Sequence, residues 1–472
     1  MSLSPSLPRV AVLGAGITGL TTAWHLQRAG LAPVVFERAS RVGGPIGALE
    51  TEGWLHELGP NSLLEGSPDV AAFIDELGLG ARRLYAAPAA RQRYVVRDGA
   101  LVAMPTSPLS FVRTQLFSLR AKIALLGEPW RARSPADQEE SVADFVVRRL
   151  GREFLDYAIN PFVGGVYAGD PARLSVRHAF PKLHALEQEH GSLIRGALKR
   201  RNASGGPKGR IFSFPGGLGE LPAALARQLG DAVRLRHTVL AVTRQDDGWQ
   251  IQFECDGQPD SARFDVVISA LTADALAALT FEGVPAADQL RALREIEQPF
   301  VASVFTGYRR ENVRHPLDGF GLLVPQVEHR KILGTLFSST LFPGRAPTGH
   351  VGLTSFVGGM RNPELSRLDD AGLVETVRTE LGELVGATGA PVFTHVQRWP
   401  RAIPQYAMNY GRYQQAFSAV EASAPGLFIG GNCRDGISLA NCIAAGRRLA
   451  ACASAFTATA APALSEGRRA GG

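Results

Sequence analysis

The chain has 472 residues, of which 45% are hydrophobic and 20% charged, and its mean hydropathy is +0.01. This length exceeds the roughly 100–200 residues of one domain, so we expect two or three domains around a large core. The net charge of +6 comes with no nucleic-acid-binding motif, so we expect no nucleic-acid partner. Residues 1–8 lack a signal-peptide pattern, and no uncharged apolar run approaches the ~18 residues of a membrane span, so the sequence predicts a cytoplasmic protein.

The first eighty residues alternate between strand and helix patterns. An apolar run, "RVAVL" at 9–13, enters a glycine-rich turn at 14–19. Apolar residues with helical spacing follow up to Gly30, and a second apolar run, "PVVFE", covers 33–37. This order predicts a βαβ unit.

The turn has the sequence Gly-Ala-Gly-Ile-Thr-Gly, which in this setting predicts a dinucleotide site. Gly14 permits the tight turn, Gly16 lets the backbone approach a pyrophosphate, and Gly19 allows close packing of helix on strand. The helix start adds unpaired N–H groups. Glu37 lies 18 residues after Gly19, where a carboxylate can accept ribose hydroxyls. A glycine turn without a ligand is the alternative, which the strand, helix and acid in register disfavour.

A second glycine pair follows closely. Gly43 and Gly44, after Arg41, would let another loop approach the same pyrophosphate without Cβ clashes. The turn at 59–62 could supply further backbone donors. Such wrapping favours a long, permanently held cofactor, FAD, over a nicotinamide that dissociates in every turnover.

Residues 85–204 have a helical character. The stretch 107–130 is amphipathic and basic, which suits either a membrane interface or packing against the rest of the protein. Another stretch, 195–210, carries six basic residues and no acid. We interpret it as a solvated loop, with contact to an anionic membrane as the alternative.

Metal sites and disulfides are not indicated. His184, Glu187 and His190 recur at every third residue, but we interpret them as polar residues on a helix surface. The four cysteines have no Cys-x-x-Cys spacing.

The rest of the chain returns to strands and ends in a strand–turn–helix unit. In that unit, Gly436 and Ser438 precede a helix of small residues. A helix start beside a flavin ring would stabilise negative charge on the reduced ring by ~0.3–2 kcal/mol. An ordinary capped helix that closes the domain is the alternative.

These patterns predict an α/β fold with mixed α+β insertions. A discontinuous Rossmann-like FAD-binding domain takes residues 1–84, 205–290 and 400–460. A helical, membrane-contacting or simply packed domain takes 85–204, a substrate-binding domain 291–399, and a flexible tail 461–472.

A family resemblance covers nearly the whole chain. From residue 10 to about 450 follow, in order, "VAVLGAGITGLTTAWHL", "ERASRVGG", "ELGPNS", "GGVYAGDPARLSV", "FPGGL", "GFGLLVP", "RWPRAIPQY" and "GISLANCI". Together they resemble the oxygen-dependent protoporphyrinogen oxidases, within the flavin amine oxidase superfamily. The first two stretches are shared across the superfamily, whereas "GVYAGDP", "GFGLLVP" and "AIPQY" are specific to the porphyrinogen branch.

The resemblance and the turns described above imply non-covalent binding of FAD. The predicted contacts are Gly14, Ala15, Gly16, Ile17, Thr18, Gly19, Glu37, Arg38, Arg41, Gly43, Gly44, Pro45, Gly59, Pro60, Asn61, Ser62, Val239, Trp399, Gly436, Ile437 and Ser438.

The resemblance also implies a flat, apolar substrate slot. Arg93 matches the residue that pairs with a propionate, and Gly165, Phe320, Gly321, Leu323 and Phe356 match positions at the macrocycle. A tetrapyrrole needs apolar faces and few polar anchors, and the planar arginine fork suits a carboxylate. Considered without the family, Arg93 would be a surface residue, and Phe320 and Phe356 would belong to the core.

The implied activity is the oxidation of protoporphyrinogen IX to protoporphyrin IX in haem biosynthesis, with dioxygen as acceptor. Hydride equivalents pass to the flavin in three rounds, and no side chain stands out as a catalytic acid or base, so positioning would be the main task of the protein. Substrate and dioxygen are the expected partners. The enzyme would be cytoplasmic or peripheral on the cytoplasmic face of the inner membrane. The oligomeric state stays open, with a homodimer as one arrangement.

Other functions remain open. A coproporphyrinogen oxidase would have the same chemistry with four propionates. An amine oxidase or a carotenoid desaturase is disfavoured because residues 300–308 lack the lysine that polyamine oxidases place near the flavin, and Pro45 stands where amine oxidases commonly have arginine. A flavin- or porphyrin-binding protein without turnover is a further alternative. Arg434 and Asp435 depart from the Tyr-Glu pair of many members, as do Ala440 and Asn441 from their Asn-Asp, so the contacts of this loop are not predicted.

Overall fold

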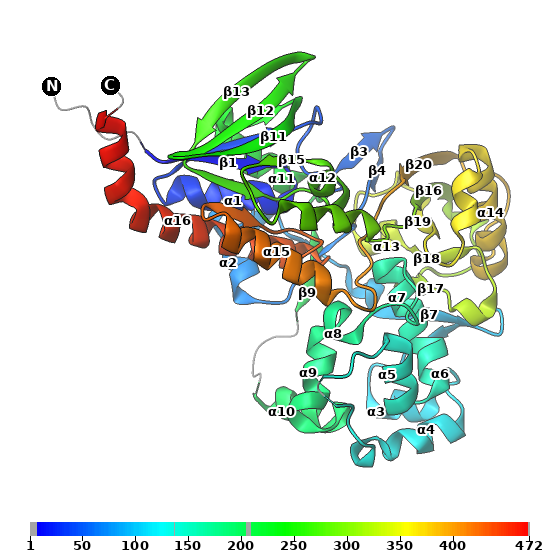
Figure 1. Ribbon diagram of the computed structural model, residues 1–472. Helices are drawn as coiled ribbons and strands as arrows, with labels where there is room; N and C mark the ends of the chain where they lie inside the picture. The colour runs from blue at the N-terminus through cyan, green and yellow to red at the C-terminus, as the bar shows by residue number, and fades with distance from the viewer. Residues whose placement is uncertain (1–6, 136, 204–208, 471–472) are drawn as a thin grey trace.

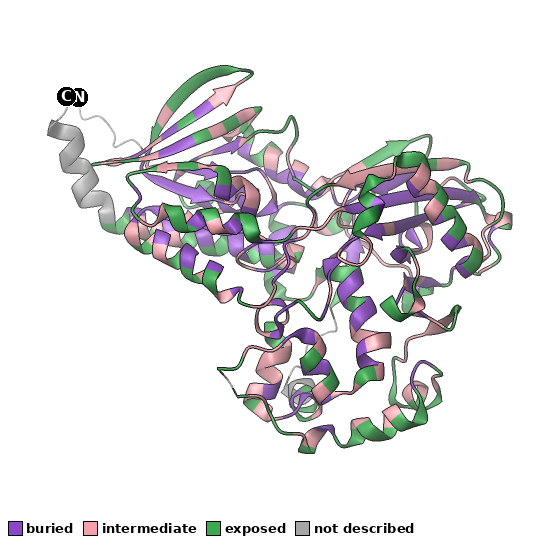
Figure 2. Ribbon diagram, turned by 45° about the vertical axis from the view of Figure 1, so that its right-hand side comes forward, coloured by how far each residue is buried: buried purple, intermediate pink, exposed green. Residues whose placement is uncertain are grey.

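The computed structural model of the chain describes residues 7–135, 137–203 and 209–470. Three bodies are visible in Figure 1: a nucleotide-binding body with a parallel sheet at the upper left, a second sheet-containing body at the right, and a helical body below them. Buried residues follow the strands of both large sheets, and exposed residues follow the outer faces of the helices (Figure 2). The α/β fold class is thereby confirmed.

The nucleotide-binding body is built on a five-stranded sheet with the order β10-β2-β1-β14-β21. All four pairings are parallel. The strands are β1 (Arg9–Leu13), β2 (Ala32–Glu37), β10 (Val233–Leu235), β14 (Val266–Ser269) and β21 (Leu427–Ile429). Because the chain runs outward from β1 on one side and continues through β14 on the other, the order reverses between β1 and β14. Ligands of such sheets bind at this reversal, beyond the carboxyl ends of the strands.

Helices from distant parts of the chain cover this sheet. The long C-terminal helix lies against the first helix of the chain, with Gly446 in contact with Thr18 and Thr21. The helices of this body are α1 (Ile17–Arg28), α2 (Pro68–Glu76), α11 (Glu220–Leu229), α12 (Ala273–Ala278), α15 (Gly411–Ser423) and α16 (Leu439–Ala470). Helix α16 continues to Ala470, over residues where the sequence predicted a flexible tail from 461. Residues 471–472 lie outside the described part.

Smaller sheets complete this body. One has the order β13-β12-β11-β15, and two short ones pair β3 with β4 and β5 with β9 and β6. Their bounds are β3 (Ala48–Thr51), β4 (Trp54–Glu57), β5 (Leu63–Glu65), β6 (Leu84–Tyr85), β9 (Arg210–Ser213), β11 (His237–Gln245), β12 (Gly248–Cys255), β13 (Gln258–Phe264) and β15 (Thr280–Glu282).

The second body is a seven-stranded sheet with the order β20-β16-β19-β18-β17-β7-β8. Helix α14 (Asp370–Val385) covers one face, where Val304 and Leu322 pack with Val377. The strands are β7 (Gln92–Arg97), β8 (Ala100–Ala103), β16 (Val301–Arg309), β17 (Gly319–Leu323), β18 (Ile332–Leu336), β19 (His350–Gly358) and β20 (Phe393–Trp399), and α13 (Ser338–Leu341) joins β18 to β19.

The hairpin β7–β8 corrects the domain boundary expected from the sequence. Residues 92–103 belong to this sheet, where β7 pairs with β17, and not to the helical segment 85–204. Asp98 and Gly99 form its turn with φ of 51° and 74°, the conformation that a two-residue hairpin requires. The sequence carried this Asp-Gly signal between two β-runs.

The helical body contains α3 (Pro108–Arg113), α4 (Leu119–Leu126), α5 (Val142–Arg149), α6 (Arg152–Phe154), α7 (Asn160–Tyr167), α8 (Val176–Ala179), α9 (Pro181–His190) and α10 (Leu193–Ala203). No helix among the described residues is long and apolar enough to cross a membrane. The basic stretch expected as a loop at 195–210 is helical up to Ala203, and residues 204–208 lie outside the described part.

Buried ion pairs hold this body together. Glu187 is fully buried and accepts a hydrogen bond from Arg148 at 2.8 Å. Arg149 pairs with Glu128, and both of these side chains are fully buried. The interpretation of Glu187 as a helix-surface residue is therefore wrong. Its partners lie about 40 residues away, so the spacing within α9 could not show them.

Residues 402–407 join all three bodies. Ala402 N–H donates to Pro299 O and Gln405 N–H to Glu297 O, at 3.0 and 2.9 Å. Gln405 Nε2 donates to Tyr167 O at 2.9 Å, and Tyr406 O accepts from Ser175 N–H at 2.8 Å. One short segment therefore contacts the helical body twice while leading from β20 to α15.

Candidate functional site

The turn between β1 and α1 has the geometry that its glycines predict. Gly14 has φ of 97° and donates its N–H to Phe36 O at 2.8 Å, which ties the turn to β2. A Cβ at Gly19 would lie 1.9 Å from Gly14 O, so only glycine allows α1 to lie this close. A Cβ at Gly16 would meet no atom within 4 Å. Gly16 thus presents bare backbone to open space, as a site for a pyrophosphate requires.

The start of α1 is open toward an anion. It follows Gly16 with no side-chain cap and has no acidic residue in its first turn, which contains Ile17 and Thr18. The partial positive charge of the helix start is therefore uncompensated by the chain.

Glu37 closes β2 beside this turn. Its Oε2 accepts from Ala15 N–H and its Oε1 from Ala39 N–H, both at 2.8 Å. A carboxylate has about four acceptor positions, so two backbone bonds leave capacity for ribose hydroxyls. Arg38, which follows, is exposed.

The second glycine pair lies directly on the first turn. Gly43 N–H donates to Ala15 O at 2.8 Å, and a Cβ at Gly44 would be 3.9 Å from Gly16 Cα. The guanidinium of Arg41 donates to Gly44 O at 2.6 Å and Ile46 O at 3.1 Å. Arg41 therefore braces its own loop from the side, and the bare backbone of the two turns faces the same space.

A third turn, at residues 59–62, packs against the second. A Cβ at Gly59 would be 2.5 Å from Pro45 O, and Asn61 Nδ2 donates to Gly59 O at 2.9 Å. Pro60 and Ser62 are half-buried in this turn. Trp399, at the end of β20, donates from Nε1 to Leu58 O at 2.8 Å, so it anchors the seven-stranded sheet to the turn.

A small polar cavity lies beneath this third turn. It has room for about one water, ~10 Å³, and is lined by His56, Glu57 and Arg345 among others. Glu57 accepts from Leu218 N–H at 2.9 Å and from Arg345 at 3.2 Å. Burial raises the pKa of Glu57 to about 7, although Arg345 acts in the opposite direction. Burial, followed by the charge of His395, lowers the pKa of His56 to about 4.

The C-terminal unit meets the same edge of the sheet. A Cβ at Gly14 would lie 3.2 Å from Ala270 O and one at Gly431 3.9 Å from it. The start of α16 lies beside that of α1, and Ser438 Oγ caps it by accepting from Asn441 N–H at 3.1 Å. Gly436 has φ of 110°, which disfavours any side chain.

Two side chains that the sequence could not place hold the turn before α16. Arg434 forms two hydrogen bonds with Glu421 of α15, at 2.6 and 2.8 Å. Asp435 accepts from Gly431 N–H and from Arg448, both at 2.9 Å. Both departures from the family pattern thus brace the turn from inside the protein.

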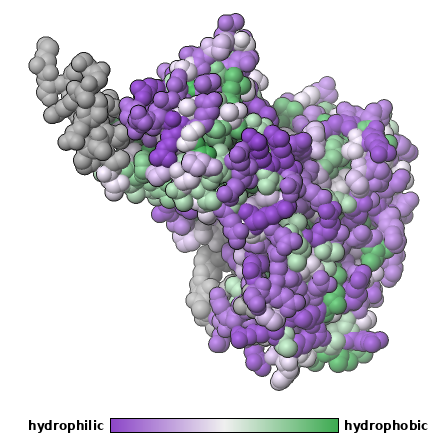
Figure 3. All heavy atoms as spheres, in the orientation of Figure 1, coloured by the Kyte–Doolittle hydropathy of each residue, from purple (hydrophilic) through white to green (hydrophobic). Residues whose placement is uncertain are grey.

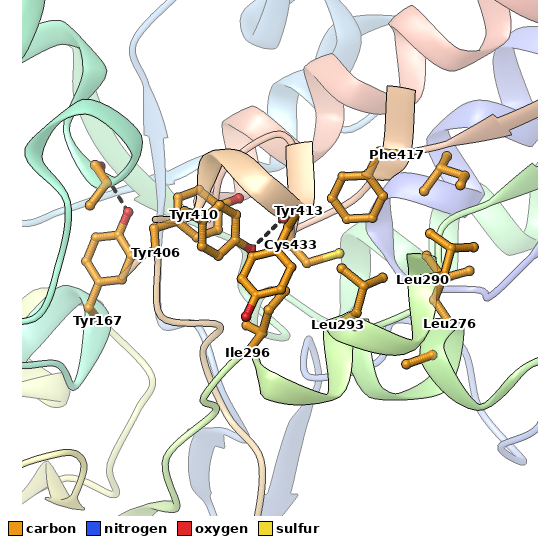
Figure 4. Close-up of a cluster of buried hydrophobic side chains, with 14 of the residues drawn as sticks. Tyr167, Leu276, Leu290, Leu293, Ile296, Tyr406, Tyr410, Tyr413, Phe417 and Cys433 are labelled. Carbon is orange, nitrogen blue, oxygen red and sulfur yellow. Dashed lines mark hydrogen bonds between the residues drawn. The ribbon is translucent and has the colours of Figure 1, made fainter. Parts of the chain in front are cut away.

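Sequence reasoning missed two tyrosines that contact this turn from the segment just before α15. Tyr406 Oη accepts from Gly436 N–H at 2.9 Å, and the hydroxyl of Tyr410 donates to Cys433 O at 2.7 Å. Figure 4 shows both rings beside Cys433, in a buried cluster. In the sequence, Tyr406 belongs to the "AIPQY" stretch that carries the family resemblance, and no local pattern links it to residues 26–30 positions later.

Val239 lies on β11 of a smaller sheet in this body. It is half-buried on β11, opposite Phe253. Phe253 in turn packs on Phe36 of β2, with ring centroids 5.0 Å apart. Phe253 therefore lies between Val239 and β2, the strand that ends in Glu37.

The predicted substrate residues share one face of the seven-stranded sheet. Leu323, Gly334 and Phe356 are direct partners on neighbouring strands, and Arg93 is the partner of Gly321 two residues before Leu323. Side chains opposite each other or two residues apart lie on the same face. This is the face opposite α14, and Phe305 on it contacts Trp54 of the nucleotide-binding body.

Contacts within this set are close. The guanidinium of Arg93 lies 5.1 Å from the ring centroid of Phe320. Gly165, on α7, faces Leu323, because a Cβ there would be 2.7 Å from Leu323 Cδ2. Gly321 has φ of 152° and its Cβ would meet Thr335 O at 2.2 Å. The structure therefore brings all six predicted residues together, five on the sheet and one across from it.

A cleft connects α7 with the cofactor side. It has a volume of about 380 Å³ and lies between α7, α8 and the start of α16, with Tyr167, Tyr406 and Ser438 among its lining residues. Its α7 wall begins at Val166, next to Gly165. A volume of this order suits a small-molecule site.

Three features therefore fit a dinucleotide: bare backbone at Gly16 and Gly44, an uncapped helix start, and a carboxylate at the end of β2. Comparison with known proteins decides the class. The family of flavin-containing amine oxidoreductases matches residues 17–454. The chain belongs to this family. It is accordingly a flavin oxidase, and its cofactor is FAD.

Similar proteins span nearly the whole chain. Protoporphyrinogen oxidase 2 of Arabidopsis thaliana is 35% identical, over 94% of this chain and 93% of its own. Coproporphyrinogen III oxidase of Bacillus subtilis is 27% identical, over 94% and 97%. A crystal structure of a candidate protoporphyrinogen oxidase from Exiguobacterium sp. 255-15 superposes with a TM-score of 0.80 at 25% identity, over 96% and 99%. Putrescine oxidase, at 16% identity and a TM-score of 0.67 over 94% and 98%, shares the fold.

Proposed function

We propose that the chain is an oxygen-dependent protoporphyrinogen oxidase, which converts protoporphyrinogen IX to protoporphyrin IX. The observation that carries the proposal is the sheet face that joins one arginine, Arg93, to the apolar side chains of Phe320, Leu323 and Phe356. The 35% identity with a plant enzyme of this name over nearly the full length supports it. An apolar ring system with few carboxylates is the substrate chemistry that such a face fits.

The cofactor would be held by the three turns described above. Backbone at Gly16 and Gly44, with the start of α1, would bind the pyrophosphate, and Glu37 would bind a ribose. The start of α16 would lie at the flavin ring. When bound, FAD would accept two electrons from the substrate, and dioxygen would reoxidise it. The role of the chain is to fix the ring, align the substrate and exclude water, since no side chain of the site is placed as an acid or base.

Arg93 would bind a carboxylate of the substrate. Its guanidinium already lies over Phe320, so the charged fork and the apolar ring would meet the propionate and the macrocycle edge at adjacent points. Gly165 leaves room opposite Leu323, where a side chain would enter the slot.

A coproporphyrinogen oxidase is the second candidate. Its substrate carries two further carboxylates, which need further cations at the site. The cleft offers the guanidinium of Arg177 on α8. The Bacillus relative carries that activity in its name.

Anaerobic mixing of the FAD-loaded protein with each porphyrinogen tests both. We expect bleaching of the yellow flavin and, by chromatography after air is admitted, faster formation of protoporphyrin than of coproporphyrin. Arg93→Ala should raise KM at least 10-fold. Arg91→Ala, at an equally exposed arginine just before β7, should not. Absence of bleaching would show that the chain is not an oxidase of either substrate, and faster coproporphyrin formation would favour the second candidate.

We propose further that the helical body lies on a membrane surface. Six large apolar side chains of residues 108–130 are 59–79% exposed: Leu109, Val112, Leu119, Ile123, Leu126 and Trp130. Figure 3 shows apolar atoms at the lower right, over α4. Arg113 and Arg120 lie in the same stretch and are exposed. Apolar side chains flanked by arginine suit an anionic interface.

Co-sedimentation with vesicles tests this contact. The wild type should sediment with vesicles that contain anionic lipid, and Ile123→Ser with Trp130→Ser should abolish it. Leu240→Ser, at an exposed leucine on β11, is the matched control. Equal sedimentation of the two variants would rule out this surface.

A further inference from the structure

Three residues spaced by four bind three successive carbonyl groups of the turn before α16. Tyr406 Oη donates to Asn432 O at 2.6 Å, and Tyr410 Oη to Cys433 O at 2.7 Å. Gln414 Nε2 donates to Arg434 O at 3.0 Å. Tyr406 precedes α15, Tyr410 is the residue that caps its start and Gln414 lies in its first turn, so the three side chains reach the turn from one continuous segment.

Tyr406 makes a second bond to the same turn. Its Oη accepts from Gly436 N–H at 2.9 Å, so one hydroxyl bridges residues 432 and 436. Phenylalanine could fill the space but could neither donate nor accept. Burial raises the pKa of Tyr406 and of Tyr410 well above the ordinary value, so both hydroxyls stay protonated and keep their donor role.

The hydroxyl of Tyr406 acts at the end of the turn that borders the cleft. Both Tyr406 and Gly436 line it, together with Ile437 and Ser438. Arg434 and Asp435, which line the same cleft, hold the turn through Glu421 and Arg448. Because Gly436 N–H is occupied by Tyr406, the direction of the next two amides depends on that bond.

We propose that Tyr406, supported by Tyr410, is a positioning residue for the flavin: it fixes the 432–436 turn so that the start of α16 is aimed at the ring. The inference rests on the proposed placement of FAD at this edge and needs no porphyrinogen. A helix start is worth about 0.3–2 kcal/mol to a nearby negative charge. Loss of its alignment should therefore weaken binding of the reduced flavin more than that of the oxidised flavin.

Tyr406→Phe is the decisive variant. It removes both bonds and keeps the ring, which lies 4.3 Å from that of Tyr410. In titrations of the bound cofactor we expect reduced FAD to lose about 10-fold more affinity than oxidised FAD, which equals a midpoint potential about 30 mV lower. The absorption band of the oxidised flavin should shift as well.

Tyr413→Phe is the matched control. Tyr413 belongs to the same aromatic cluster, with its ring 5.1 Å from that of Tyr410 and edge-on to it, but its hydroxyl accepts from Arg412 and contacts no carbonyl of the turn. Its potential and spectrum should equal those of the wild type. Tyr410→Phe removes the single bond to Cys433 O and should lower the midpoint potential by a smaller amount. It replaces Tyr406→Phe as the test if that variant fails to fold.

Two results would overturn the proposal. One is an unchanged potential in both Tyr406→Phe and Tyr410→Phe, and the other is an equal shift in Tyr413→Phe. Gly16→Ala separates this failure from a wrong cofactor placement. If Gly16→Ala weakens FAD binding and Tyr406→Phe leaves the potential unchanged, only the positioning role is lost. If neither variant changes FAD binding, the placement itself is wrong.

Discussion

The two ends of the chain bring different devices to the same edge of the parallel sheet. The N-terminal turns are held by backbone: Gly43 N–H on Ala15 O, and Gly59 against Pro45 O. The turn at 431–436 is held by side chains from other elements, among them Tyr406 and Glu421. Close backbone approach admits only glycine, whereas several side-chain sets could fix a turn. The N-terminal turns therefore show as a glycine motif in the sequence, whereas the contacts that hold the 431–436 turn do not.

The largest effect is expected where the backbones touch. Gly19→Ala would place a methyl carbon 1.9 Å from Gly14 O, so α1 must move and we expect little folded protein, with a loss of about 3 kcal/mol or more. Gly16→Ala meets no atom within 4 Å. Its melting temperature without FAD should be unchanged, while its FAD affinity should fall at least 10-fold. Calorimetry and flavin titration measure the two, and normal FAD affinity in Gly16→Ala would place the pyrophosphate elsewhere.

A smaller and pH-dependent effect is expected at His56, under the third turn. Neither of its ring nitrogens has a partner within the described chain, and burial lowers its pKa from 6.5 to about 4. Between pH 4 and pH 6.5, the imidazole of His56 therefore binds a proton in the unfolded chain but not in the folded chain. Stability from this group is complete above pH 6.5 and is lost as the pH falls toward 4, by up to about 3 kcal/mol.

His56→Phe should remove that loss, because phenylalanine packs beside Phe305 as the imidazole does and takes no proton. Denaturant unfolding at pH 7 and pH 5 should show a smaller difference than in the wild type. His329→Asn, at an exposed histidine, should behave as the wild type. A wild-type pH response in His56→Phe would mean that another group is responsible.

The smallest effect is expected at the side-chain device. Glu421→Ala removes both bonds to Arg434 and the acceptor of Ile429 N–H, and we expect about 1–2 kcal/mol lower stability. Glu375→Ala, in the exposed Glu375–Arg378 pair, should cause no measurable change. A loss at Glu421 as large as at Gly19 would remove the distinction between the two devices.

The sequence indicates local geometry best where one residue type is obligatory and its partner is close along the chain. Gly14, Gly19 and Glu37 lie as their spacing indicated. The face that carries Arg93 and Phe356 depended on family resemblance, because strand register cannot be derived from such short runs. The boundary at β7–β8 was misplaced although Asp98-Gly99 signalled the hairpin.

Predictions failed where the partner is distant. Glu187 is buried by Arg148 and Arg149, and Tyr406 reaches a turn that follows 26 residues later. Local periodicity does not contain such pairings. The structure adds to the expected site a set of buried polar side chains, each with one definite partner.

The segment 402–407 has a consequence for how the chain length can vary. Its hydrogen bonds to Pro299, Glu297, Tyr167 and Ser175 fall within five residues. Inserting or deleting a single residue there would shift Gln405 and Tyr406 away from all of their hydrogen-bond partners. The turn before α16, which Tyr406 binds, would be displaced as well. Surface loops tolerate changes of length, but this stretch is expected to keep its residue count together with the side chains of Gln405 and Tyr406.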